Sequence, residues 1–259
     1  MLIEKLQPRA WDERRDIIVP GDYQMTLIFC VEHFIAQSKQ AIKDHDAFFV
    51  ALSGGSTPKA IFERLTSPPY DQMIEWNKLH LFWSDERAVP PDHADSNYHM
   101  AMLAGLSKMP IPKEQIHRMD AEGKIEENAL DYEQKIAVVL KGRPFDLIML
   151  GMGEDGHTAS LFPNTQGLHI ENRLVIANFI PEKKTWRMTM TFSCINNALN
   201  TAIYVLGSPK KETLAEVLLS PNQFDRYPVQ RVGTPSRHVL WIADEAAAAA
   251  LIAKKEQLK

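Results

Sequence analysis

The sequence has little cysteine and no long apolar segment, and both absences narrow the class of protein. Its 259 residues contain two cysteines, Cys30 and Cys194, with no CxxC motif and no disulfide-scaffold spacing, so a reducing compartment is the simpler inference. No apolar run approaches the ~18 residues that a membrane span needs. Residues 1–16 are rich in charge and lack the apolar core of a signal peptide. We therefore expect a cytoplasmic protein with no membrane partner.

An excess of basic charge is also absent. Lys and Arg total 29 against 33 Asp and Glu, which gives a formal net charge of −4. A protein that neutralises nucleic-acid phosphates needs a basic face, so we expect no nucleic-acid partner. The densest basic cluster, residues 9–15, also contains Asp12 and Glu13, and we interpret it as a solvated segment.

Motifs for metal binding and for serine hydrolases are missing as well. The nine histidines include no HxxxH or HExxH pair, and no serine lies in a GxSxG elbow. We expect no metal site, and a Ser-His-Asp hydrolase is disfavoured.

The sequence does contain short apolar runs that alternate with helical stretches, which is typical of an α/β protein with a mostly parallel sheet. The predicted strands are residues 47–53, 78–84, 146–150, 174–179, 187–192, 202–206 and 239–243. The predicted helices are residues 57–65, 96–103, 209–219 and a C-terminal helix capped by Asp244. No repeat or linker composition interrupts them, so we expect one domain over residues 1–259, with its first strand at about residue 47.

Three loops follow predicted strands, where ligands bind in open α/β sheets. The first reads SGGSTP at residues 53–58. Its glycines, its hydroxyls and the N-terminus of the next helix together suit a phosphate, although a plain strand–helix turn is the alternative. The second reads SDERAVP at residues 84–90. Its Arg87 offers the planar donors that bind phosphate or carboxylate, and a surface turn with compensated charge is the alternative.

The third loop reads GMGEDGHTASLFP at residues 151–163. It contains a GxGxxG pattern, but Pro163 ends any helix too early for a dinucleotide-binding crossover. His157, with Asp155 two residues earlier, has the chemistry of a general base near neutral pH, because a carboxylate can fix the imidazole tautomer. A purely structural histidine is the alternative.

These three motifs, in this order and spacing, resemble those of 6-phosphogluconolactonases within the glucosamine-6-phosphate deaminase/6-phosphogluconolactonase family. Three shorter matches accompany them: RMT at residues 187–189, GxxK at 207–210 and WIAD at 241–244. The resemblance spans residues 47–251. It implies a single-domain, three-layer Rossmann-like sandwich similar to glucosamine-6-phosphate deaminase and ribose-5-phosphate isomerase. It also implies hydrolysis of 6-phospho-D-glucono-1,5-lactone to 6-phosphogluconate, the second step of the oxidative pentose phosphate pathway, with no metal or organic cofactor.

The resemblance and the chemistry together assign roles. His157 is the expected general base on water, with Asp155 as its partner, and backbone N–H groups of residues 151–156 are our candidates for the oxyanion donors. The expected phosphate- and substrate-binding residues are Ser53, Gly54, Gly55, Ser56, Thr57, Asp85, Arg87, Lys184, Arg187 and Lys210. The expected partner is a small sugar-phosphate lactone, bound by a monomer or a small homo-oligomer.

Two other functions remain open. A sugar-phosphate deaminase or isomerase of the same fold has a loop that resembles DGHIAFNEP, and the glutamate of that loop is absent from residues 155–163 here. A non-catalytic sugar-phosphate sensor of a transcription regulator needs a helix-turn-helix arm, and residues 1–46 contain no basic recognition helix.

Overall fold

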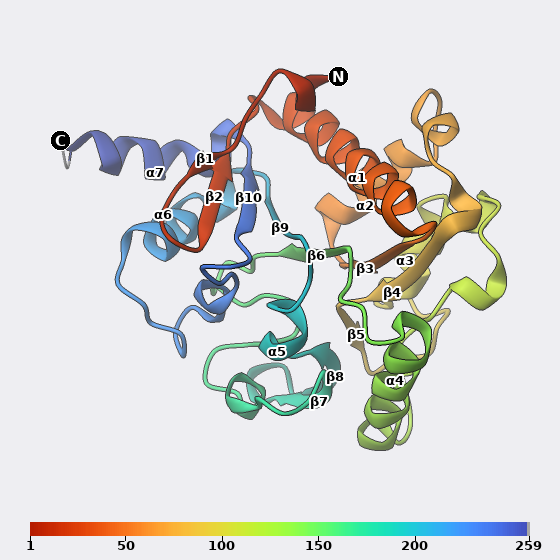
Figure 1. The fold of residues 1–259 in the computed structure, drawn as a ribbon. Coiled ribbons are helices and arrows are strands. Elements are labelled where there is room, and N and C mark those ends of the chain that lie inside the picture. Colours follow the sequence, from red (N-terminus) through yellow and green to blue (C-terminus); the bar gives the residue numbers. More distant parts are fainter. Residues whose placement is uncertain (258–259) are drawn as a thin grey trace.

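The computed structural model describes residues 1–257, and a twisted sheet of seven strands runs through that part of the chain (Figure 1). The strand order is β1 (Arg9–Ala10), β2 (Arg15–Ile18), β10 (Val239–Ala243), β9 (Thr201–Val205), β6 (Leu147–Gly151), β3 (Phe48–Leu52) and β4 (Leu79–Trp83). Only β1 is antiparallel to its neighbour within these residues. The α/β class with a mostly parallel sheet is therefore confirmed.

Helices flank this sheet. They are α1 (Tyr23–His45), α2 (Ser56–Leu65), α3 (Asn97–Leu103), α4 (Ile125–Leu140), α5 (Phe192–Ile195), α6 (Lys211–Leu219) and α7 (Glu245–Gln257). Helix α1 packs beside α2, and α6 packs beside α7, as Figure 1 shows. All five residues of β3 and all five of β9 are buried. Continuous apolar strands of this kind are expected where helices cover both faces of a parallel sheet.

Side-chain caps fix where several helices begin. Asp22 Oδ1 accepts the backbone N–H of Met25 at the start of α1 (2.9 Å), and Asp244 Oδ1 accepts that of Ala247 at the start of α7 (2.8 Å). A cap of this type satisfies an N–H group that has no partner within the helix. The predicted role of Asp244 is confirmed.

A second, antiparallel sheet lies at one end of the main sheet, in the lower part of Figure 1. In the described chain it consists of β5 (Asp85–Arg87), β8 (Thr185–Met190) and β7 (Val175–Ile180). Helix α4 packs against β7 and β8. This small sheet matters for function because β5 starts directly after β4 and thereby carries Arg87 to the carboxyl end of the main sheet.

Two expectations about the N-terminal region are wrong. The first strand is β1 at residue 9, not residue 47. Arg15 is buried rather than solvated: its side chain pairs with Asp12 at 2.5 Å and donates to the carbonyl of Val217 at 3.1 Å. The segment joins the sheet through β10, a long-range pairing that local composition does not reveal. Among residues 1–257, no helix is both long enough and apolar enough to cross a membrane.

Candidate active site

The carboxyl ends of four adjacent parallel strands meet at one edge of the main sheet. The loops after β3, β6 and β9 and the start of β5 after β4 enclose a cavity of about 180 Å³ there. Its lining residues are Ser53, Gly54, Gly55, Asp85, Arg87, Gly151, Met152, Gly153, His157, Ala159 and Lys210. All three loops singled out from the sequence contribute to it. A larger cavity, about 630 Å³, lies between α4 and β7 and contains none of these residues.

His157 and Asp155 form a close pair in the loop after β6. The Nδ1 atom of His157 lies 2.5 Å from Oδ1 of Asp155, and the same oxygen accepts the backbone N–H of His157 at 3.1 Å. Burial alone would raise the pKa of Asp155, but the hydrogen bond from His157 and its charge outweigh that effect, and the pKa is lowered. Asp155 is therefore a carboxylate at neutral pH, able to hold the Nδ1 proton and leave Nε2 for a ligand.

The glycines of this loop allow His157 to pack closely against the backbone of Gly153. Gly153 N–H donates to the carbonyl of His157 at 2.8 Å, and a Cβ atom at Gly153 would lie 2.0 Å from the imidazole Nδ1. Gly156 has a φ of +79°, and its N–H donates to Gly153. The glycines of the GxGxxG pattern thus fix the shape of the loop itself.

Arg87 and Arg187 lie opposite each other in the register of β5 and β8. The Nε atoms of both are buried, and neither has a hydrogen-bond partner within the described chain. Burial, and then the charge of Arg87, lowers the pKa of Arg187. Two adjacent guanidinium groups with unused donors are costly unless an anion joins them. The two guanidinium groups can therefore bind an anion together.

Glu86 and Asn97 hold this cationic pair in place. The Glu86 carboxylate accepts the backbone N–H groups of Asn97 (2.7 Å), Tyr98 (2.8 Å) and Arg87 (2.8 Å), and it thereby ties the start of α3 to the strand that carries Arg87. Burial raises the pKa of Glu86 even though these three donors act against it. Asn97 Nδ2 in turn donates to the Asp85 carbonyl at 2.9 Å.

The loop at residues 53–58 approaches the cavity through its backbone. A Cβ atom at Gly54 would lie 1.8 Å from Oδ1 of Asn97, so only glycine fits there. Helix α2 begins at Ser56, and no side chain of the described residues caps its first turn. Its leading N–H groups and its positive dipole end are thus available to an anion.

Most predicted site residues come together, and three lie at the margin. Ser53, Gly54, Gly55, Asp85, Arg87, His157 and Lys210 line the cavity, while Asp155 and Arg187 contact lining residues directly. Ser56 and Thr57 form the first turn of α2 without lining the cavity. Lys184 is exposed at the turn before β8, where its φ is 49°. Its neighbour Lys183 places Nζ 5.5 Å from the ring centroid of Phe162, which stacks on His157.

Sequence reasoning missed three supporting residues. Asn97 packs on Gly54, Ser160 Oγ donates to Asp85 Oδ2 at 2.7 Å, and Phe162 covers the His157 ring. Ser160 and Phe162 lie inside the third motif, but the sequence alone does not show which residue of the motif contacts which loop. The N–H groups of Gly153 and Gly156, two of our oxyanion candidates, are already bonded within their own loop.

Comparisons with known proteins agree with this geometry. A family model described as glucosamine-6-phosphate isomerases/6-phosphogluconolactonase matches residues 22–241. The 6-phosphogluconolactonase of Chlamydia pneumoniae is 43% identical over 210 residues, covering 81% of this chain and 80% of the relative. That of Nostoc sp. is 39% identical over 244 residues, covering 92% and 99%. The solved 6-phosphogluconolactonase of Trypanosoma cruzi superposes with a TM-score of 0.80 at 28% identity, covering 95% of this chain and 99% of that chain.

Proposed function

The chain belongs to the glucosamine-6-phosphate isomerase/6-phosphogluconolactonase family, and we propose that it is the enzyme that hydrolyses 6-phospho-D-glucono-1,5-lactone to 6-phosphogluconate in the oxidative pentose phosphate pathway. The proposal rests on one observation: a candidate base and a candidate anion-binding element lie at the same cavity. One side holds the carboxylate-bound imidazole of His157, and the other holds paired arginines with unused donors. A phosphorylated ester needs both features.

The phosphate binds at the cationic side. Arg87 and Arg187 supply planar donors, and the N–H groups at the start of α2 supply a positive dipole end. Lys210 reaches the same cavity, where its Nζ lies 3.9 Å from Glu154. Lys184 remains a predicted ligand whose side chain would have to swing inward from the hairpin turn. Anchoring the phosphate orients the lactone, and orientation is worth up to about 7–11 kcal/mol in well-aligned cases.

His157 acts first as a base and then as an acid. Its Nε2 accepts a proton from water while the water oxygen forms a bond to the lactone carbonyl carbon, C1, and the C1 carbonyl becomes an oxyanion. The tetrahedral intermediate then collapses, the bond between C1 and the ring oxygen breaks, and Nε2 returns its proton to that oxygen. Asp155 stabilises the imidazolium between the two steps.

The oxyanion needs donors preorganised at the position where its charge develops. The N–H groups of Gly153 and Gly156 are bonded within their own loop, so we place this role on the other backbone N–H groups of residues 151–156, where Gly151 and Met152 line the cavity.

One assay tests the proposal against its near rival. Fresh lactone is supplied to the wild type and to His157→Ala, and 6-phosphogluconate is measured by coupled reduction of a nicotinamide cofactor, with spontaneous opening subtracted. We expect catalysed hydrolysis by the wild type alone. Ammonia release from glucosamine 6-phosphate, without lactone hydrolysis, would instead identify a deaminase. We further propose one domain over residues 1–259, acting in the cytoplasm as a monomer or small homo-oligomer.

A further inference from the structure

The reaction described above does not use the aromatic side chain that covers its base. The ring of Phe162 stacks on the imidazole of His157, with ring centroids 3.9 Å apart and planes 17° from parallel. Phe162 itself is only 5% exposed. Contact at this distance extends over the ring face, so the imidazole cannot rotate about its attachment without leaving the phenyl ring.

The segment that carries Phe162 is anchored independently of the histidine. The Phe162 carbonyl accepts Thr165 Oγ1 at 2.8 Å. Asn178 Nδ2, on β7, donates to that hydroxyl at 3.1 Å and to the Ser160 carbonyl at 2.9 Å. Ser160 N–H donates to Thr189 Oγ1, on β8, at 3.1 Å. The phenyl ring is thus a fixed surface built on the small sheet, and His157 rests on it.

Asp155 and Phe162 restrain different motions of the same ring. The hydrogen bond to Asp155 fixes the Nδ1 edge of the imidazole, but a ring held only by one edge can still swing about that bond. The stack on Phe162 fixes the plane. Resting on the proposed function, we propose that Phe162 is a positioning residue that holds Nε2 of His157 in line with the attacking water.

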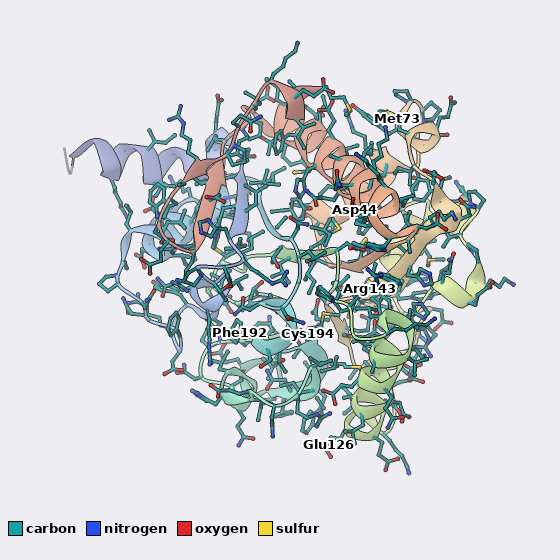
Figure 2. All side chains as sticks on the ribbon, in the orientation of Figure 1. Asp44, Met73, Glu126, Arg143, Phe192 and Cys194 are labelled. Atoms are coloured by element: carbon teal, nitrogen blue, oxygen red, sulfur yellow. The ribbon has the colours of Figure 1, made fainter. Side chains whose placement is uncertain are left out.

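The chain offers a matched control, Phe192, which is not among the residues that line the cavity. Phe192, labelled in Figure 2 on α5, is also 5% exposed, and it too has a cation over its ring, the Arg231 guanidinium at 5.2 Å. A change at Phe192 therefore costs comparable packing and does not touch His157. Methionine is the replacement of choice at both positions, because it fills similar volume without a flat ring.

The test compares kcat and KM for Phe162→Met, Phe162→Tyr, Phe192→Met and the wild type, each shown to be folded by thermal melting. We expect Phe162→Met to lose roughly 10- to 100-fold in kcat, since small misplacements at a reacting centre have effects of that size. Its KM stays within about twofold, Phe162→Tyr recovers most of the rate, and Phe192→Met keeps the wild-type kcat. A wild-type kcat in Phe162→Met, or an equal kcat loss in Phe192→Met, would overturn the proposal.

A second measurement separates this inference from the proposed function. In proton NMR, the ring-current field of Phe162 displaces the His157 Cε1–H resonance, which His157→Gln identifies by its disappearance. We expect Phe162→Met to move that resonance and Phe162→Tyr to retain it. If the wild type leaves lactone unhydrolysed but the resonance still behaves this way, the function is wrong and the positioning stands. An unchanged resonance in Phe162→Met overturns the positioning.

Discussion

Stacked histidines lie at both ends of the main sheet, and their surroundings differ. At the carboxyl end, His157 stacks on Phe162, bonds to Asp155 and lines a cavity. Near the amino end, His80 of β4 stacks on His117 with ring centroids 5.7 Å apart, and Nδ1 of His80 lies 3.4 Å from Nε2 of His117.

The difference lies in the partner and in access to solvent. His117 is 8% exposed, and burial, with smaller contributions from His80 and Lys135, lowers its pKa to about 4. His45, in the same region, does have a carboxylate: its Nε2 lies 2.9 Å from Asp146 Oδ1. That carboxylate, however, also accepts the backbone N–H of Phe49 and joins β3 to β6. Of these two histidine–carboxylate pairs, only that of His157 lines a cavity at the carboxyl end of the sheet, which is why we propose the catalytic role for it.

The largest effect on activity is expected when the ring of the proposed general base is removed. His157→Ala should lower kcat by about 10²- to 10⁴-fold, the range for loss of a general base, with little change in KM because the phosphate contacts remain. His80→Ala should leave the kcat of the folded protein unaltered. Steady-state rates of lactone hydrolysis measure both, and a wild-type rate in His157→Ala would refute the mechanism.

The paired arginines distinguish the carboxyl end by charge, because Arg87 and Arg187 lie opposite each other there with unpartnered Nε atoms. Arg187→Ala should raise KM by about 10- to 100-fold, as expected when hydrogen bonds to a charged phosphate worth about 1.5–3 kcal/mol are lost. Inhibition by 6-phosphogluconate gives a parallel measure of affinity. An unchanged KM would mean that the phosphate binds elsewhere.

The histidines near the amino end of the sheet should affect the free energy of unfolding rather than the rate of hydrolysis. In the unfolded chain a histidine has its ordinary pKa near 6.5, whereas folded His117 has a pKa of about 4. Between these values the unfolded state binds more protons, so stability is full above pH 6.5 and is lost as pH falls toward 4. Urea unfolding at pH 7 and pH 5 should differ by roughly 2 kcal/mol from this group. His117→Gln should reduce that difference, and an undiminished slope would contradict the assignment.

The smallest effect is expected at Lys210. It lines the cavity, yet its side chain is 28% exposed and its nearest acid, Glu154, is 3.9 Å away. Solvent screens such charges, and exposed pairs contribute about 0–1 kcal/mol. Lys210→Ala should therefore raise KM only about two- to fivefold. A loss as large as that of Arg187→Ala would show that the ammonium closes over the phosphate when substrate binds.

Local sequence predicted a large part of the fold. Strand β10 occupies residues 239–243, as expected from its apolar run, and α2 begins one residue before the predicted start. The pairing of Arg15 with β10 could not be predicted in this way, because the burial of that arginine depends on two segments at opposite ends of the chain. The pairing of Arg87 with Arg187 could not be predicted either, because β5 and β8 are far apart in the sequence and pair only in the folded small sheet.

What the sequence determined by itself is the chemistry available at the strand ends: glycines with hydroxyls after β3, an arginine after β4, and a histidine near an aspartate after β6. Parallel strands deliver such loops to one edge, so their convergence follows from local signals. Only the tertiary structure decided which side chains meet there. Phe162 lies on the His157 ring, Asn97 lies on Gly54, and two arginines share one face. Contacts of this kind depend on the register of a second sheet and on close packing, and the spacing of residues along the chain predicts neither of them.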